Sequence, residues 1–72
     1  MKNYFNFSEI YGSMTFRVSA AMTLTDIVRA IYGSDEQKYY DCITALNKRY
    51  DWAFVRPGAT IKYLEKQVVD EL

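Results

Sequence analysis

The stretch TLTDIVRAIYG, residues 23 to 33, carries the signals of both ends of a helix. Thr23 suits the N-cap because its hydroxyl can accept a backbone N–H that the first turn leaves free, and Asp26 completes a variant capping box. Gly33 supplies the left-handed residue that often follows a helix. We therefore expect a helix from Leu24 onward, with an apolar stripe formed by Leu24, Ile27, Val28 and Ile31.

A second helix is predicted directly after the first. Ser34 and Gln37 repeat the start signal, and Asp35 and Glu36 add negative charge near the positive end of the helix. Asn47 is expected to end it. The predicted buried face consists of Tyr39, Ile43 and Leu46, with Cys42 beside them.

Two short strands are predicted to flank these helices. Residues 14 to 18 alternate between apolar and polar side chains. RPGA, residues 56 to 59, is typical of a type II turn, because Pro57 fixes φ at the second position and Gly58 tolerates a positive φ at the third. Residues 60 to 64 then form a strand antiparallel to the first. The expected fold class is α+β, a β-α-α-β domain with two helices packed on a two-stranded antiparallel sheet.

The N-terminal segment is predicted to be extended. Residues 4 to 10 alternate loosely, with Phe5 and Phe7 on one face and polar side chains on the other. Residues 11 to 13 then suit a turn, so this segment either pairs with the following strand as a hairpin or projects as an arm. We assign residues 1 to 15 to an aromatic N-terminal arm or extra strand.

A chain of 72 residues holds one small core, and no internal repeat or linker divides it. We expect the domain to span residues 16 to 64, followed by a short charged tail, EKQVVDEL, over residues 65 to 72. Residues 48 to 54 show neither helical nor strand periodicity. They are expected to form an ordered loop that Trp52 or Phe54 pins to the core.

Few side chains in this chain can carry out chemistry. It has no histidine, and its one cysteine, Cys42, lies beside an apolar helix face, where packing is the expected role. One cysteine cannot supply the four ligands of a structural zinc site. The pair Asp35-Glu36 suits the start of a helix better than acid–base catalysis. We therefore expect no catalytic residue, metal or cofactor, and no enzyme activity.

The charge pattern disfavours two classes of partner. Nine basic and nine acidic residues cancel, and no basic run exceeds Lys48-Arg49, so no nucleic-acid-binding surface is expected. Polar residues interrupt the apolar ones near the N-terminus, so neither a signal peptide nor a membrane span is expected. A single cysteine cannot form an internal disulfide, which suits a reducing cytoplasm.

Aromatic residues form two candidate groups. Those of the N-terminal segment lie on a predicted strand whose edge can pair either with another chain or within a hairpin: Tyr4, Phe5, Phe7 and Tyr11. Those of the second helix and the following loop either fill the core or present flat rings to a sugar or a protein: Tyr39, Tyr40, Tyr50, Trp52 and Phe54.

The order and spacing of these motifs resemble a LysM domain, the small β-α-α-β module of peptidoglycan-binding proteins and phage tail baseplates. The resemblance covers residues 16 to 64, about two thirds of the chain. In its first half it rests on Val18, Thr23, Leu24, Ile27 and Tyr32-Gly33. In its second half it rests on Asn47 in ITALNKRY and on PGATIKY, residues 57 to 63.

The second helix, SDEQKYYDCITALN, and the long loop before RPG are most similar to the tail protein X group of tailed phages and contractile injection particles. This resemblance implies a structural joint at the baseplate hub, with hub, spike, tube-initiator and baseplate proteins as partners. It also implies a location in the virion tail or a phage-like particle, assembled in the host cytoplasm. The expected partner-binding residues are Tyr4, Phe5, Phe7, Tyr11, Tyr50 and Trp52, with Pro57 and Gly58 as a structural turn.

A glycan-binding LysM module is the alternative that the resemblance leaves open. It would recognise N-acetylglucosamine polymers of peptidoglycan through the loops at residues 20 to 25 and 47 to 57. Ala21-Met22 replace the usual Gly-Asp, so the first loop is less polar than in sugar-binding members. The glycan contacts would be Met22, Thr23, Asn47, Tyr50 and Trp52. A regulatory adaptor that retains only the fold is a third alternative.

Overall fold

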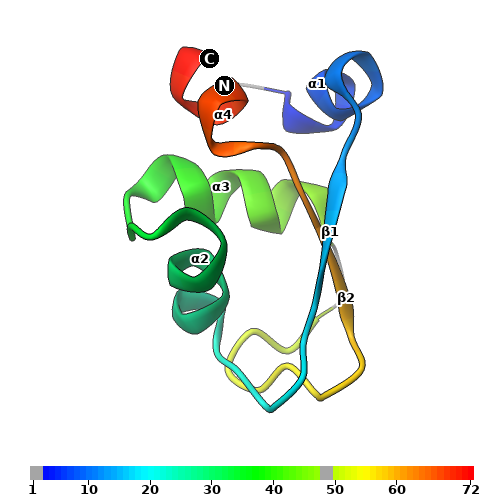
Figure 1. Cartoon of the computed structure of the whole chain (residues 1–72), viewed down its shortest axis with the longest axis vertical. Helices are drawn as coiled ribbons and strands as arrows, with labels where there is room; N and C mark the ends of the chain where they lie inside the picture. Colours follow the sequence, from blue (N-terminus) through cyan, green and yellow to red (C-terminus); the bar gives the residue numbers. More distant parts are fainter. Residues whose placement is uncertain (1–2, 48–49) are drawn as a thin grey trace.

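A computed structural model gives the structure of this chain and describes residues 3–47 and 50–72, with only the backbone described at Phe5. Its elements are α1 (Tyr4–Tyr11), β1 (Met14–Arg17), α2 (Leu24–Tyr32), α3 (Gln37–Leu46), β2 (Thr60–Tyr63) and α4 (Lys66–Glu71) (Figure 1). The predicted α+β class is confirmed. The order β, α, α, β is also confirmed for residues 14–63.

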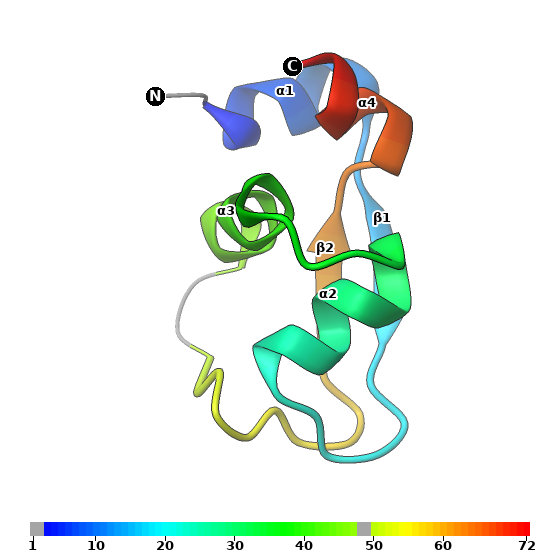
Figure 2. The same cartoon turned by 90° about the vertical axis from the view of Figure 1, so that its left-hand side faces the viewer.

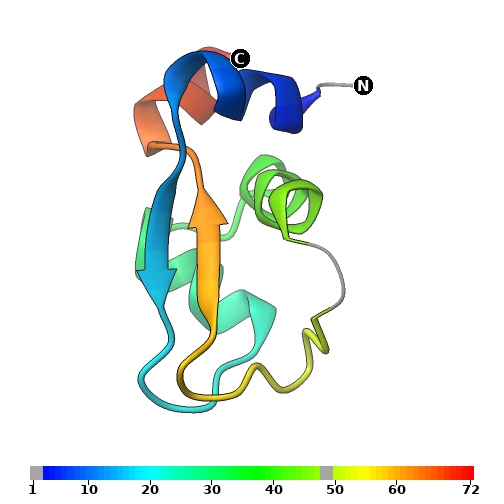
Figure 3. The same ribbon diagram turned by 90° about the vertical axis from the view of Figure 1, so that its right-hand side faces the viewer.

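The two strands form an antiparallel sheet, as predicted. Met14 of β1 lies opposite Tyr63 of β2, and Phe16 lies opposite Ile61. Helices α2 and α3 cover one face of this sheet, while its other face is open in Figure 3. Phe16 and Ile61 point toward the helices, because Ile61 is fully buried and Phe16 packs against the same core. The sheet is therefore half-buried, with one face in solvent.

The turn at residues 56–59 leads into β2 and contacts the chain just after β1. The Ala59 N–H donates to the Arg56 carbonyl at 3.2 Å, and Gly58 has φ +92°. This is the geometry of a type II turn, as predicted from Pro57 and Gly58. The Val18 carbonyl accepts from Gly58 N–H at 2.7 Å, so the turn also holds the end of β1.

Helix α2 begins and ends at the predicted residues. The Thr23 hydroxyl accepts from the Asp26 N–H at 3.2 Å, and the Asp26 carboxylate accepts from the Thr23 N–H at 3.1 Å. The two bonds form the predicted capping box. Gly33 follows with φ +70°. Ile27 and Val28 are fully buried, and Leu24 and Ile31 pack against the core beside them.

Helix α3 starts later than predicted. Glu36 occupies its N-cap position and no side chain caps it, so the predicted start signal at Ser34 is wrong. Residues 33 to 36 are needed to turn the chain from α2 into α3. The Asp35 carboxylate pairs with Arg29 of α2 at 3.0 Å and does not lie in the first turn of α3. The predicted buried face is confirmed at Tyr39, Cys42 and Ile43, while Leu46 is partly buried.

Asn47 joins the end of α3 to the middle of β2. It is a buried polar residue, and its side-chain oxygen accepts from the Lys62 N–H at 2.8 Å. Its side-chain nitrogen donates to the Lys62 carbonyl at 2.7 Å and to the Ile43 carbonyl at 2.9 Å. The amide thus forms the bonds that a neighbouring strand would form with Lys62 of β2. It also adds a second bond to the Ile43 carbonyl, which already accepts from the Asn47 backbone N–H at the helix end.

The predicted N-terminal strand is wrong, because residues 4–11 form helix α1. The Asn3 side chain caps this helix by accepting from the Asn6 N–H at 3.2 Å. Tyr4 and Phe7 lie one helical turn apart, and both contribute to the core, with Tyr4 only 5% exposed. The helical spacing of Tyr4 and Phe7 therefore brings both side chains to the core, whereas the predicted strand alternation would have paired Phe5 with Phe7. Gly12, with φ +79°, provides the predicted turn, but it joins a helix to a strand.

The segment predicted as a short charged tail is helical, because residues 66–71 form helix α4. Its Val69 is fully buried, and Val68 and Leu72 pack against the core. Helices α1 and α4 lie at the same end of the molecule, above α3 (Figure 2). The segments predicted as an extended arm and as a tail thus each contain a helix, and the two helices close this end of the core.

Asp70 joins α4 to α3 through Tyr39 and Lys38, and it also pairs with Lys66 of its own helix. It accepts a hydrogen bond from the Tyr39 hydroxyl, and it forms ion pairs with Lys38 and Lys66, each at 2.9 Å. The Tyr39 hydroxyl and the two ammonium groups hold the pKa of the Asp70 carboxyl well below its usual range. The charged form of Asp70 therefore favours the folded chain.

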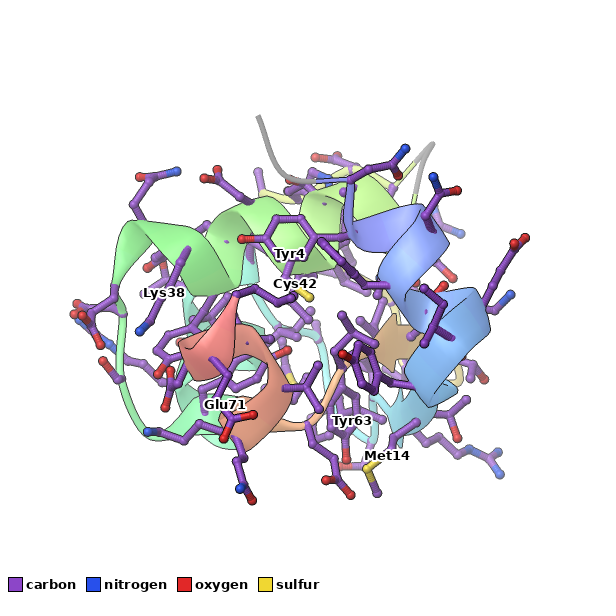
Figure 4. All side chains as sticks on the ribbon, turned by 90° about the horizontal axis from the view of Figure 1, so that it is seen from above. Tyr4, Met14, Lys38, Cys42, Tyr63 and Glu71 are labelled. Atoms are coloured by element: carbon purple, nitrogen blue, oxygen red, sulfur yellow. The ribbon has the colours of Figure 1, made fainter. Side chains whose placement is uncertain are left out.

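The core between these helices contains two stacked tyrosines. The rings of Tyr32 and Tyr39 lie 4.4 Å apart at an interplanar angle of 13°. The Tyr32 hydroxyl donates to the Leu64 carbonyl at 2.8 Å and contacts the Cys42 sulfur at 3.7 Å. Figure 4 shows Tyr4 and Cys42 close together at the end of the core that α1 covers.

Replacing Asn47 with alanine should destabilise the fold. The substitution leaves the N–H and the carbonyl of Lys62 without the Asn47 amide, and such a loss costs about 1–3 kcal/mol. The Ile43 carbonyl keeps its bond from the backbone N–H of residue 47. Urea unfolding followed by circular dichroism measures the free energy of unfolding. Asn6→Ala, at an exposed position of α1, is the matched control and should change it little. Equal stability of the two variants would contradict the structural role of Asn47.

Replacing Asp70 with asparagine should weaken the dependence of stability on pH. The pKa of Asp70 is lower in the folded chain than in the unfolded chain, so its stabilising contribution is present at neutral pH. That contribution is lost as the pH falls below the unfolded value of about 4. Between about pH 5 and about pH 2, the wild type should therefore lose more stability than Asp70→Asn in thermal unfolding. Glu71→Gln, on the same helix, should behave like the wild type.

Candidate functional site

Exposed apolar residues lie close together in the sequence where α1 meets β1. Four large hydrophobic residues of the described chain are strongly exposed, and three of them lie within five positions: Ile10 at 71%, Tyr11 at 60% and Met14 at 45%. We call these three residues the N-terminal patch. The fourth, Phe54, is 56% exposed and lies far along the chain in the loop before β2.

The local chain path explains why the N-terminal patch stays in solvent. Gly12 ends α1 with a positive φ that side-chain-bearing residues rarely adopt, and the chain then turns into β1. Ile10 and Tyr11 form the last residues of α1, beyond the turn that Tyr4 and Phe7 attach to the core. Met14 is the first residue of β1 and lies beside Tyr63 in Figure 4.

The four aromatic residues predicted as anchors in this segment have different environments. Tyr11 is exposed and belongs to the N-terminal patch, whereas Tyr4 is a buried core residue and cannot reach a partner in this conformation. Burial raises the pKa of the Tyr4 hydroxyl. Phe7 is half-buried against the core, and the side chain of Phe5 lies outside the described part. Sequence reasoning missed Ile10 and Met14, although both lie within two positions of Gly12.

The loop residues of the second aromatic group, Tyr50, Trp52 and Phe54, lie in a segment that hydrogen bonds hold against the rest of the domain. The Trp52 carbonyl accepts from the Leu24 N–H at 2.9 Å, and the Tyr50 hydroxyl donates to the Thr60 carbonyl at 3.0 Å. The rings of Tyr50 and Trp52 lie 5.4 Å apart. Both residues pack against the core, whereas Phe54 does not. Trp52 therefore pins this loop, as predicted; Lys48 and Arg49 of the same loop lie outside the described residues.

The structure brings together only some of the predicted glycan contacts. Met22 and Val55 exchange two backbone hydrogen bonds, at 3.1 and 2.8 Å, which places the loop after β1 beside the loop before β2. Thr23 and Trp52 lie at this junction. The Thr23 hydroxyl caps α2, however, and the Asn47 amide is fully used within the fold. Of the polar side chains predicted to bind sugar, these two are thus committed to local structure.

Cys42 has the buried packing position that the sequence predicts. It is fully buried, and burial raises the pKa of its thiol. A protonated, inaccessible thiol is a poor nucleophile. Across the described residues, histidine, cysteine and carboxylate side chains form no group of three or more that could hold a metal ion. In the same part of the chain, no helix is long and apolar enough to cross a membrane.

Comparison with protein-family models, with curated proteins and with solved structures finds no significant match to this chain.

Replacing Trp52 with alanine should destabilise the fold more than replacing Phe54 with alanine. Trp52 packs against the core, and its loss should cost about 2 kcal/mol, below the range for a fully buried tryptophan. Phe54 is mostly in solvent, so its loss should change the free energy of unfolding by no more than about 0.5 kcal/mol. Urea unfolding of both variants measures the difference. A larger loss of stability for Phe54→Ala would mean that Phe54, and not Trp52, attaches the loop to the core.

Proposed function

We propose that this chain is a structural LysM-like component of the baseplate or hub of a phage tail or contractile injection particle. In this role it joins tube, spike and baseplate proteins, and its activity is assembly. The chain would assemble with these partners in the host cytoplasm. In the assembled state it would be located in the virion tail or a phage-like particle.

Two features support the LysM-like part of the proposal. The elements β1, α2, α3 and β2 follow each other in the order that the resemblance implies, with the two strands antiparallel. Residues that carry the resemblance also have local roles: Thr23 caps α2, Gly33 ends it, and Gly58 forms the turn before β2. The resemblance therefore rests partly on residues that fix helix ends and a turn, as the motifs of a fold family commonly do.

The N-terminal patch is the observation that carries the assembly role. Its three side chains expose apolar surface that gains free energy only when another surface covers it. Tyrosine, methionine and isoleucine at the centre of an interface can act as anchors, because their burial excludes water at small entropic cost for the aromatic ring. Tyr11 keeps its predicted partner-binding role in this proposal, joined by Ile10 and Met14, whereas Tyr4 supports the core.

The rest of the fold suits a docking module. Helix α1 is attached to α3 through Tyr4 and Phe7, so the N-terminal patch is presented on a fixed support. A preorganised surface loses less conformational entropy on binding than a disordered arm. Helix α4, tied down by Asp70, closes the same end of the molecule. Helices α1 and α4 thus both pack onto the rest of the domain.

Glycan binding is the second candidate, favoured by one observation. Tyr50 and Trp52 lie next to each other, and Trp52 lies beside the loop after β1 through its bond to Leu24. Paired aromatic rings beside a second loop can stack on a sugar face. Against this, both rings are partly used in packing, and the amide of Asn47 is fully bonded within the fold.

Affinity purification of the tagged full chain from its native source, with mass spectrometry, tests the proposal. The triple variant Ile10→Gln, Tyr11→Gln and Met14→Gln should bind its partners at least roughly thirtyfold more weakly and recover correspondingly less of them, because loss of even one anchor typically costs about 2 kcal/mol. Phe54→Gln is the matched control, since it replaces the other strongly exposed hydrophobic residue. Point substitutions are preferable to removal of residues 1–13, which would also remove Tyr4 from the core.

Recovery of tube, spike or baseplate proteins with the wild type and the control, but not with the triple variant, would support the hub role. Sedimentation of the same preparation with insoluble peptidoglycan distinguishes the second candidate. Sedimentation that a chitooligosaccharide competes away, with no tail protein recovered, would contradict assembly and favour glycan binding.

A further inference from the structure

The open face of the sheet carries positive charge. Ile61 and Phe16 point toward the helices, so their strand neighbours Arg17 and Lys62 point the other way. Both are exposed, and the remaining outward positions of the strands hold the neutral residues Thr15 and Thr60. No helix covers this side of the sheet in Figure 3.

Arg56, exposed in the turn that leads into β2, adds a third cation next to this face. The ion pairs found among the described residues use Arg29, Lys38 and Lys66 instead. The charges of Arg17, Arg56 and Lys62 are therefore free to meet an anionic surface. We call these three residues the basic sheet face.

The opposite side of the molecule is acidic. Asp35 and Glu36 occupy the turn between α2 and α3, and Asp26 lies in the first turn of α2. All three are exposed. Asp35 pairs with Arg29, and Lys38, two positions after Glu36, is itself paired with Asp70 of α4. Asp26 and Glu36 belong to none of the ion pairs found among the described residues, which leaves an excess of negative charge on this side. We call Asp26, Asp35 and Glu36 the acidic face.

The two faces lie on opposite sides of the fold. In Figure 1 the connection between α2 and α3 is at the left and the two strands are at the right. The quarter turns to either side agree, because the connection faces the viewer in Figure 2 and the strands face the viewer in Figure 3. The chain is thus polarised across one of its shorter dimensions.

We propose that copies of this chain associate head to tail, with the acidic face of one copy on the basic sheet face of the next. Charge complementarity identifies a second copy as the partner, since each copy carries both signs and the whole chain has nine basic and nine acidic residues. Net repulsion between copies is consequently absent. This inference concerns surfaces that the proposed hub function does not use.

The symmetry of this contact follows from its geometry. The two faces differ, so each bound copy still offers one free face of each sign. Such a contact continues until a ring closes or a filament grows. The surfaces are polar and exposed, so attraction between them should weaken once the Debye length falls from roughly 14 Å to about 4 Å between 50 and 500 mM salt.

Sedimentation equilibrium of the purified full chain tests the inference. At about 50 mM NaCl the average mass should rise above the 8.5 kDa of the monomer as protein concentration increases. At about 500 mM NaCl the chain should return to the monomer mass. A monomer at low salt up to roughly millimolar concentration would overturn the proposal, and so would association that salt does not weaken.

Charge exchange makes the test specific to the two faces. Arg17→Glu with Lys62→Glu makes both faces acidic, while Asp35→Lys with Glu36→Lys makes both basic. Each variant alone should be monomeric at low salt, and an equimolar mixture of the two should associate again. Glu9→Lys with Glu71→Lys, which changes the net charge as much as the second variant does, should associate like the wild type. Variants that behave alike, or a mixture that stays monomeric, would overturn the proposal.

Discussion

The stacked rings of Tyr32 and Tyr39 connect most of the molecule. Tyr32 lies at the end of α2, and its hydroxyl reaches the Leu64 carbonyl just after β2, while its ring packs on Tyr39 of α3. The Tyr39 hydroxyl then reaches Asp70 of α4. Two side chains therefore join three helices and the end of a strand. In a domain of this size, with little room for aliphatic layers, aromatic rings with hydrogen-bonding edges serve both packing and orientation.

Local chemistry explains which parts of the fold could be predicted from the sequence. Thr23, Asp26 and Gly33 specify the ends of α2 through bonds within one turn, and Pro57 with Gly58 specifies a turn through backbone geometry alone. Helix α1 could not be found this way, because Tyr4 and Phe7 pack into a core formed by residues far along the chain, those of α3 among them. The same holds for Val69 of α4. Asp35 fits the first turn of α3 by its charge alone. Its ion pair with Arg29 depends on how α2 and α3 meet, which local sequence does not specify.

The candidate surface was only partly predictable for the same reason. An exposed Tyr11 and a buried Tyr4 look alike in an aromatic stretch, and only the helical path of α1 separates them. Asn47 was expected to end α3, and it does, but its second role as a partner for Lys62 of β2 needs the tertiary fold. The proposed assembly role accordingly rests on Ile10, Tyr11 and Met14, at the junction of α1 and β1.

Site-specific photo-crosslinking in the native source tests most directly whether the N-terminal patch is a docking surface. A photoreactive phenylalanine analogue placed at Tyr11 should give discrete adducts with one or two proteins of the assembled particle. The same analogue at Phe54, which is similarly exposed in a different loop, should give none. Adducts from Phe54 with none from Tyr11 would contradict docking through the N-terminal patch.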